Sequence, residues 1–173
     1  MPDTAGVDSD RLTARLTDLV ARAPGRLSLA VRSSSGFRFD HDATRVVPSA
    51  STIKVAILLA YLESGMPWDL PVGLPPGDRR VGGCGPLSLL PSVTSLPAGE
   101  LLTLMIALSD NDATNAILDV LGVGAVSRLL ARAGARHTVL RRRMMDPAAV
   151  AAGRENETTA AEQAELLAQL RSG

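Results

Sequence analysis

The segment Pro48-Ser49-Ala50-Ser51-Thr52-Ile53-Lys54-Val55 opens a long apolar run that continues to Leu62. Small and polar residues followed by apolar ones, with no Gly or Pro among the latter, predict the N-terminus of a buried helix. Ser51 then lies at the start of this helix. Lys54 follows three residues later, so both side chains share one helical face. The spacing is S-x-x-K.

This spacing suits nucleophilic catalysis. A serine hydroxyl needs a base beside it, and a lysine can be that base only where burial lowers its pKa. The N–H groups at a helix start also favour a developing oxyanion. The chain has seventeen Arg and one Lys, which is Lys54, and Arg cannot act as a base. The alternative is that S-x-x-K occurs by chance and that Lys54 snorkels from a core helix.

Length and composition narrow the possible classes of protein. With 173 residues, 46% of them hydrophobic, and zero formal net charge, the chain is expected to form one globular domain. We expect no nucleic-acid or membrane partner, and residues 141–143, all Arg, are interpreted as solvated or ion-paired. Cys84 is the single cysteine and there are two histidines, so we expect no disulfide, metal or cofactor. Residues 1–10 lack the apolar stretch of a signal peptide.

Periodicity predicts an α+β chain that is mostly helical. Residues 27–31 and 37–39 alternate in polarity and indicate an N-terminal pair of antiparallel strands. Residues 67–99 are rich in Pro and Gly and are expected to be irregular, with at most a short helix near 87–90. Apolar spacing and capping signals predict the remaining helices, at 12–20, from Ser51 to near Gly65, and at 98–108, 113–121, 125–133 and 160–170.

A second motif, Ser109-Asp110-Asn111, lies between two of these predicted helices. Its hydroxyl can relay protons and its carboxamide can bind a substrate carbonyl in a shared cleft. Alone, S-D-N is a common turn sequence. Together with S-x-x-K it resembles class A β-lactamases and penicillin-binding proteins. The resemblance extends to residues 81–83, 104–115 and 153–159, and spans roughly residues 10 to 173.

The resemblance implies a role for each motif residue. Ser51 would be the acylated nucleophile, and Lys54 its base or proton relay. Ser109 would pass the proton to the β-lactam nitrogen, and Asn111 would bind the side-chain amide of the substrate. The family's deacylating carboxylate usually lies in an E-x-x-L-N pattern, for which the best match here is Asp146.

The match at Asp146 departs from that pattern in two ways. Asp is one methylene shorter than Glu, and Val150 stands where the water-holding Asn is expected. A shorter carboxylate without this partner is less able to hold water within the roughly 3 Å that general-base catalysis requires. The alternative for Asp146 is structural: a helix cap, or an ion pair with Arg142 or Arg143.

The third motif of the family, K-T-G or K-S-G, does not occur in these 173 residues. We therefore expect residues 1–173 to form a single, incomplete β-lactamase-like catalytic domain that lacks the C-terminal strands. Opening of a β-lactam, the expected small-molecule substrate, should then be weak or absent. The alternatives are a penicillin-binding DD-peptidase acting on cell-wall peptides, and a non-catalytic homologue or gene fragment. Family members usually work in the periplasm or outside the cell, and the sequence leaves the location open.

Overall fold

The computed structural model describes residues 9–172, which divide into two compact units. Unit 1 contains the described residues up to Arg45 together with those from Thr159 onward, and unit 2 contains Val46–Thr158. The prediction that residues 1–10 carry no signal peptide falls mostly on residues 1–8, outside the described residues.

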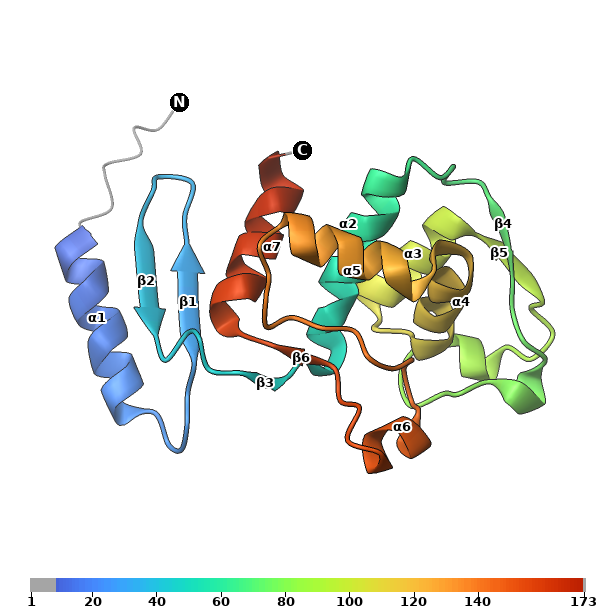
Figure 1. Cartoon of the computed structure of the whole chain (residues 1–173), viewed down its shortest axis with the longest axis horizontal. Coiled ribbons are helices and arrows are strands. Elements are labelled where there is room, and N and C mark those ends of the chain that lie inside the picture. Colours follow the sequence, from blue (N-terminus) through green and yellow to red (C-terminus); the bar gives the residue numbers. More distant parts are fainter. Residues whose placement is uncertain (1–8, 173) are drawn as a thin grey trace. The chain divides into compact units, whose positions relative to one another are not determined.

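Unit 1 combines two helices with a β-hairpin (Figure 1). In the hairpin, Leu29 pairs with His41 and Arg32 with Arg38 in antiparallel register, as the alternating sequence predicts. Strand β1 contacts helix α7, and Thr159 caps α7 by accepting a hydrogen bond from the Glu162 N–H. The elements of unit 1 are α1 (Ser9–Arg22), β1 (Leu29–Arg32), β2 (Arg38–His41) and α7 (Ala160–Ser172).

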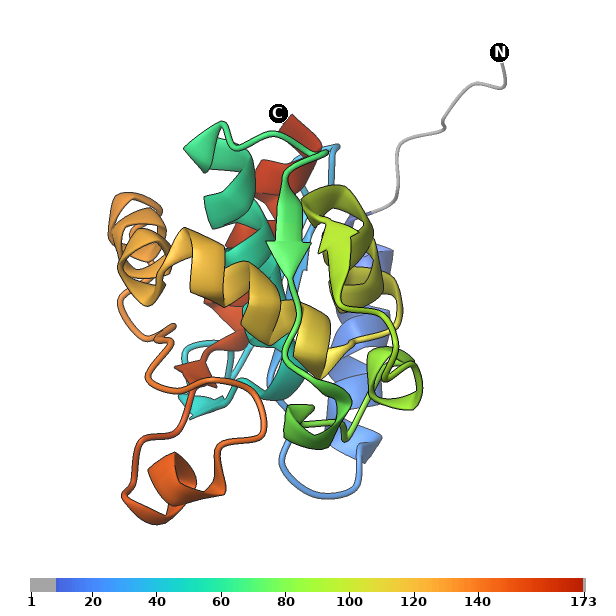
Figure 2. The same ribbon diagram turned by 90° about the vertical axis from the view of Figure 1, so that its right-hand side faces the viewer.

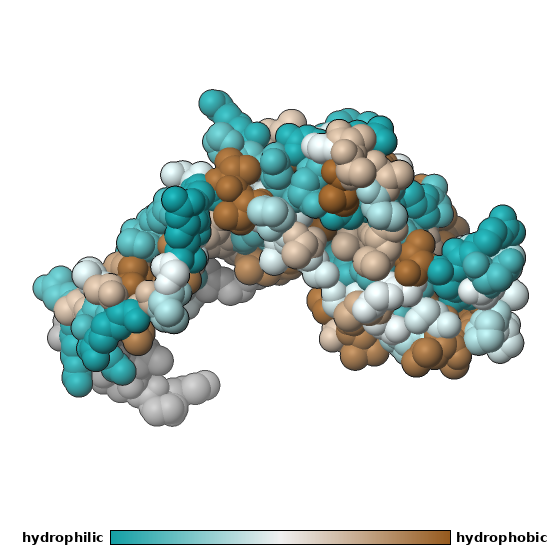
Figure 3. All heavy atoms as spheres, turned by 90° about the horizontal axis from the view of Figure 1, so that it is seen from below, coloured by the Kyte–Doolittle hydropathy of each residue, from teal (hydrophilic) through white to brown (hydrophobic). Residues whose placement is uncertain are grey.

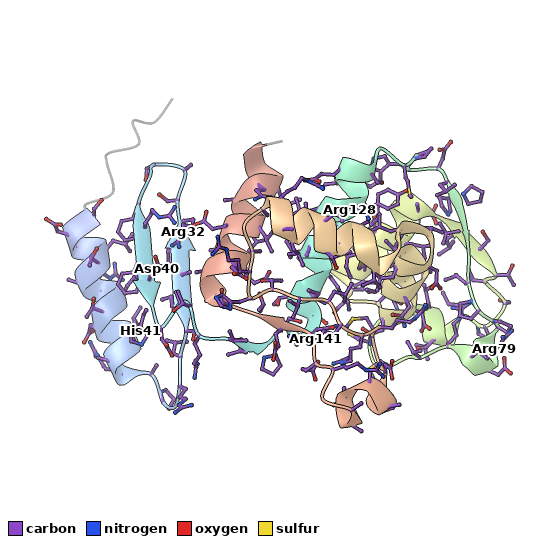
Figure 4. All side chains as sticks on the ribbon, viewed as in Figure 1. Arg32, Asp40, His41, Arg79, Arg128 and Arg141 are labelled. Carbon is purple, nitrogen blue, oxygen red and sulfur yellow. The ribbon has the colours of Figure 1, made fainter. Side chains whose placement is uncertain are left out.

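An ion-pair network ties the hairpin to α7. The Arg32 guanidinium is largely buried and donates to Glu165 of α7 at 2.7 Å, while Asp40 of β2 lies 2.9 Å from Arg32 (Figure 4). Arg38 also donates to Glu165. The two arginines lower the pKa of Glu165 because they favour its charged form. Charged side chains from three elements therefore meet on one face of the hairpin.

Unit 2 is built around helix α2, which contacts α3, α4 and α5. A helix that is apolar on all sides is a core helix, and Ile53 and Ile57 of α2 are fully buried. Gly65 ends α2 in the left-handed conformation, with φ of 69°. The predicted helices of this unit are confirmed. Their bounds are α2 (Ile53–Ser64), α3 (Ala98–Ala107), α4 (Asn111–Leu121) and α5 (Val123–Arg132), and a 3₁₀ turn, η1 (Ala50–Thr52), precedes α2.

Two short strand pairs in unit 2 were not predicted (Figure 2). Strands β4 (Pro71–Gly73) and β5 (Ser95–Pro97) pair antiparallel, as do β3 (Val47–Pro48) and β6 (Glu157–Thr158). The expectation that residues 67–99 contain at most a short helix was therefore wrong. Strands of two or three residues are too short to show an alternating pattern, and proline at paired positions conceals them further. The short helix does occur as η3 (Leu87–Leu89), and η2 (Gly77–Arg79) adds a second turn.

Helix α6 (Pro147–Ala151) is a single short turn that the sequence analysis did not predict. Across residues 9–172, no single helix has the length and apolar character needed to cross a membrane. Helices α4 and α5 have that length and apolar character only when taken together, and a bend of 84° separates them. Buried residues of both helices belong to the core of unit 2.

Candidate active site

Lys54 joins the two predicted motifs. It lies in the first turn of α2, is 2% exposed, and its Nζ lies within hydrogen-bond distance of four oxygens. These are Ser109 O at 2.6 Å, Ser109 Oγ at 2.9 Å, Asn111 Oδ1 at 3.0 Å and Ser51 Oγ at 3.3 Å. Ser109 Oγ also donates to Ser51 Oγ at 2.8 Å. Four of the five predicted site residues therefore form one hydrogen-bonded cluster.

The environment of Lys54 favours its neutral form. Burial lowers the pKa of the amine, and the nearby Cys84 and Asp110 oppose this effect only in part. A low-dielectric site destabilises an ammonium relative to an amine. The chain's single lysine thus lies beside two hydroxyl groups in a site that lowers the pKa of its amine.

Strained backbone conformations lie at or next to the site residues. Ala50, Ser109 and Met145 all have positive φ, at 45°, 55° and 56°. Ala50 precedes Ser51, and Met145 precedes Asp146. For a residue with a side chain this conformation costs on the order of 1–2 kcal/mol, and such residues cluster at functional sites.

Asp110 fixes the loop that faces the cluster. Its side chain is fully buried, and its carboxylate accepts from the N–H groups of Ala113 and Leu87, at 2.8 and 2.9 Å. Gly85, with φ of 94°, packs against it so tightly that a Cβ there would lie 2.2 Å from Asp110 Oδ2. Asp110 therefore caps α4 and also holds the loop segment from Gly85 to Leu87.

The carboxamide of Asn111 is held on both sides. Its Oδ1 accepts from Lys54, and its Nδ2 donates to Gly82 O at 2.8 Å. Its backbone N–H donates to Cys84 O at 3.1 Å. The next residue, Asp112, binds two backbone N–H groups of the same loop, those of Val81 and Gly82. The sequence analysis assigned no role to Asp110 or Asp112; two acidic residues flanking Asn111 at a buried helix start were the available signal.

A groove of about 720 Å³ opens beside Ser51. Its polar and charged groups come from Ser51, Cys84, Asn111, Arg142 and Asp146, and its apolar wall includes Val81, Met144, Met145, Pro147 and Val150. Met145 and Val150 are about half exposed. Figure 3 shows hydrophobic residues, in brown, gathered in patches among hydrophilic ones on one face of the molecule. The groove is therefore mostly apolar, with a few polar and charged groups.

Asp146 lines this groove but also has a structural role. It is the N-cap residue of α6, and its Oδ1 accepts from the Ala149 N–H at 2.9 Å. Within residues 9–172 it makes no hydrogen bond to Ser51, Lys54 or Asn111. Of the two alternatives, the structure shows the helix cap directly, whereas a catalytic role for Asp146 stays a prediction.

The segment that carries Asp146 is held at both ends. The Asn115 amide bonds the backbone of Met144 twice, accepting from its N–H at 2.9 Å and donating to its carbonyl at 3.1 Å. Arg142 forms an ion pair with Glu155. The neighbouring Arg141, labelled in Figure 4, pairs with Glu157 of β6. The interpretation of residues 141–143 as solvated or ion-paired is confirmed in its second form, since Arg143 also binds Asp119.

The described residues contain no cluster of three or more His, Cys, Asp or Glu side chains that could hold a metal ion. The cluster around Lys54 consists of an amine, two hydroxyls and an amide. Such groups transfer protons and bind carbonyl groups. The cluster can therefore exchange protons between its amine and hydroxyl groups and bind a carbonyl group.

Comparison with known proteins supports this interpretation. A β-lactamase from Sphaerobacter thermophilus superposes with a TM-score of 0.79 at 27% identity, covering 94% of this chain and 63% of that protein. PBP-A superposes with a TM-score of 0.75 at 27% identity, covering 94% of this chain and 62% of that protein. A PBP-A variant, solved as an acyl-enzyme complex with penicillin G, has the same TM-score at 26% identity, with coverages of 95% and 62%. No curated protein matches the chain.

The chain thus spans 62–63% of the length of these structures. The expected α+β fold of β-lactamases and penicillin-binding proteins is confirmed by the superpositions. The sequence model of the β-lactamase enzyme family matches residues 11–173, nearly the whole chain. With S-x-x-K and S-D-N brought together around one buried lysine, the chain belongs to the β-lactamase enzyme family.

Proposed function

We propose that the chain carries the acylation machinery of a serine hydrolase of the class A β-lactamase type. In this proposal Ser51 opens the amide of a β-lactam and forms an ester with its carbonyl carbon. The observation that carries the proposal is the position of Lys54 Nζ, 3.3 Å from Ser51 Oγ and 2.9 Å from Ser109 Oγ. One buried amine therefore reaches both hydroxyl groups that must exchange protons.

The proton inventory balances over these three residues. As Ser51 Oγ attacks the carbonyl carbon, its proton passes to neutral Lys54, either directly or through Ser109, whose Oγ lies 2.8 Å from Ser51 Oγ. Ser109 then donates a proton to the ring nitrogen as the C–N bond breaks, and Lys54 returns one to Ser109. The products are an ester on Ser51 and an N–H on the opened ring, with Lys54 again neutral.

Asn111 is suited to binding the substrate. Its Nδ2 carries two hydrogens, one of which is donated to Gly82 O. The residue lines the groove, so the other hydrogen can be donated to the side-chain carbonyl of an acylated substrate. Apolar groups such as Met144 and Val150 would surround the rest of that side chain.

A second candidate is a penicillin-binding, peptidase-like enzyme that releases its acyl group slowly. The observation that favours it is the environment of Asp146, whose Oδ1 is occupied by the cap of α6 while the neighbouring groove wall is apolar. A carboxylate in this position is poorly placed to hold a water against the ester. PBP-A, whose variant has been captured as a penicillin acyl-enzyme, superposes about as well as the β-lactamase.

Peptide mass mapping after incubation with penicillin G tests the acylation site. The adduct is expected on the peptide that contains Ser51, and Ser51→Ala should abolish it. Ser49→Ala is the matched control, because Ser49 is a buried neighbour whose Oγ, among residues 9–172, donates a hydrogen bond only to the backbone carbonyl of Ala50. An adduct on Ser49 or Ser109, or one that persists in Ser51→Ala, would contradict the proposal.

A further inference from the structure

Two consecutive residues of α4 form hydrogen bonds with the backbone of Gly82, one with its carbonyl and one with its N–H. Asn111 Nδ2 donates to Gly82 O at 2.8 Å. Asp112 accepts from the Gly82 N–H through Oδ2 at 3.2 Å, and from the Val81 N–H through Oδ1 at 2.8 Å. Gly82 has φ of 60°, a conformation that favours glycine. These contacts therefore set the position of the Gly82 carbonyl, and glycine can adopt the φ that this position requires.

The Gly82 carbonyl determines which way the Asn111 amide points. A carbonyl oxygen only accepts hydrogen bonds, so the NH₂ group of Asn111 must face it and Oδ1 must face the other way. On that other side lies Lys54 Nζ, 3.0 Å from Oδ1. If Gly82 O moved away, the amide could rotate and present NH₂ to the amine, which would remove one of its acceptors.

Asp112 is suited to holding the segment that carries this carbonyl. It is 2% exposed, and a buried carboxylate is tolerated when it accepts strong hydrogen bonds. It occupies the second residue of α4, where the helix dipole favours a negative charge. Among residues 9–172, Asp112 makes no hydrogen bond to Ser51, Lys54 or Ser109, so any influence on them is indirect.

We propose that Asp112 is a positioning residue, which holds the Val81–Gly82 segment in place, fixes the direction of the Asn111 amide and thereby orients the Lys54 amine toward Ser51. The inference rests on the proposed acylation function, because an oriented amine matters for that step. The structural part of the inference can be tested without any substrate.

The single lysine makes this test direct. A chain labelled with ¹³Cε-lysine gives one side-chain signal, that of Lys54, whose pH titration reports the environment of the amine. In Asp112→Asn we expect the titration midpoint to move to lower pH, because the ammonium loses the Asn111 acceptor. Asp112→Glu keeps the charge but displaces the carboxylate by a methylene, and should move the midpoint in the same direction. Asp119→Asn, which removes one charge from the same helix without touching the loop, should leave it unchanged.

These variants separate a positioning role from simpler ones. An unchanged Lys54 titration in Asp112→Asn, with only a lower melting temperature, would overturn the inference. A shift in Asp112→Asn that is absent from Asp112→Glu would assign the effect to charge, and would also overturn it. If both variants unfold, hydrogen exchange in the unmodified chain decides, since the Val81 and Gly82 N–H groups must exchange more slowly than an unpaired loop amide.

The rate of Ser51 acylation by penicillin G provides the functional readout. We expect Asp112→Asn to lower this rate about tenfold, as for the loss of a hydrogen bond to a charged group. If the unmodified chain forms no adduct on Ser51, the proposed function fails. The Lys54 titration still supports or overturns the role of Asp112 in that case.

Discussion

Substitution of Asp146 separates its structural role from its predicted catalytic one. Its Oδ1 accepts from Ala149 N at 2.9 Å. Asn caps a helix about as well as Asp, whereas Ala loses the cap at a cost of about 1 kcal/mol. For a chain of this size, that cost lowers Tm by about 2–4 °C. We therefore expect Asp146→Ala to melt about 2–4 °C lower, and Asp146→Asn to melt within about 1 °C of the unmodified protein.

The two variants should behave alike in deacylation if Asp146 activates the hydrolytic water. Loss of a general base costs about a hundredfold or more in rate, so the penicilloyl ester on Ser51 should persist correspondingly longer, while acylation changes little. Intact-mass measurements after removal of free penicillin give both rates. An unchanged ester lifetime in Asp146→Asn would show that the residue serves only as a cap, leaving Lys54 as the candidate base. Equal loss of both steps would mark Asp146 as structural.

Two further predictions concern the loop and the buried amine. Gly85→Ala combines an unfavourable positive φ with overlap against Asp110, so it should lower the free energy of unfolding in urea by about 2–5 kcal/mol. Gly134→Ala, at a φ of 70° with open space around it, should lower it by about 1 kcal/mol. Equal losses in the two variants would refute the overlap argument. Burial lowers the pKa of Lys54 in the folded state below the unperturbed 10.5. Between these two pKa values the unfolded state binds more protons than the folded state. The contribution of Lys54 to stability should therefore rise with pH across this range and be smallest below the folded pKa. Lys54→Met should remove this contribution when the free energy of unfolding is measured across that pH range. Burial raises the pKa of Tyr61, which gives the opposite trend with pH. Subtracting the stability–pH profile of Lys54→Met from that of the unmodified protein cancels the Tyr61 trend.

The helices were predictable because their signals are local. Apart from Lys54, Ile53 to Leu62 is almost entirely apolar. Gly65, Gly122 and Gly134 follow helices that end within one or two residues of them. Side-chain periodicity and C-terminal glycines depend only on neighbouring residues. The sequence therefore specifies these elements without reference to the rest of the fold.

The short strands could not be predicted in this way. Val72 pairs with Leu96 across more than twenty residues, and neither strand is long enough to show alternation. Pro71 and Pro97 stand opposite each other, and their missing N–H groups make both segments look like turns. Their pairing depends on the helices that hold both segments at the surface of unit 2, which is information that no local window contains.

The site shows the same division between local and long-range information. The spacing of Ser51 and Lys54 is one helical turn and was visible directly. The approach of Ser109 and Asn111 to Lys54 was implied only by resemblance, since it requires α4 to start against α2. The loop contacts of Asp110 and Asp112 were not predicted, because the N–H groups they bind there, those of Val81, Gly82 and Leu87, lie more than twenty residues away in the sequence. The direction of those groups depends on positive φ angles at glycines such as Gly82.

The contacts of Lys54 fit a neutral amine at least as well as an ammonium. An ammonium has three hydrogens and no acceptor, yet four oxygens lie within reach of Nζ. Two of them, Ser109 O and Asn111 Oδ1, can only accept, while the hydroxyls of Ser51 and Ser109 can also donate. A neutral amine would give its two hydrogens to the two obligate acceptors and turn its lone pair toward the hydroxyls. The fixed acceptors therefore do more than stabilise a buried charge: they orient the lone pair toward the groups whose protons must move. This is why the direction of the Asn111 amide, and the segment that secures it, bears on the reactivity of Ser51.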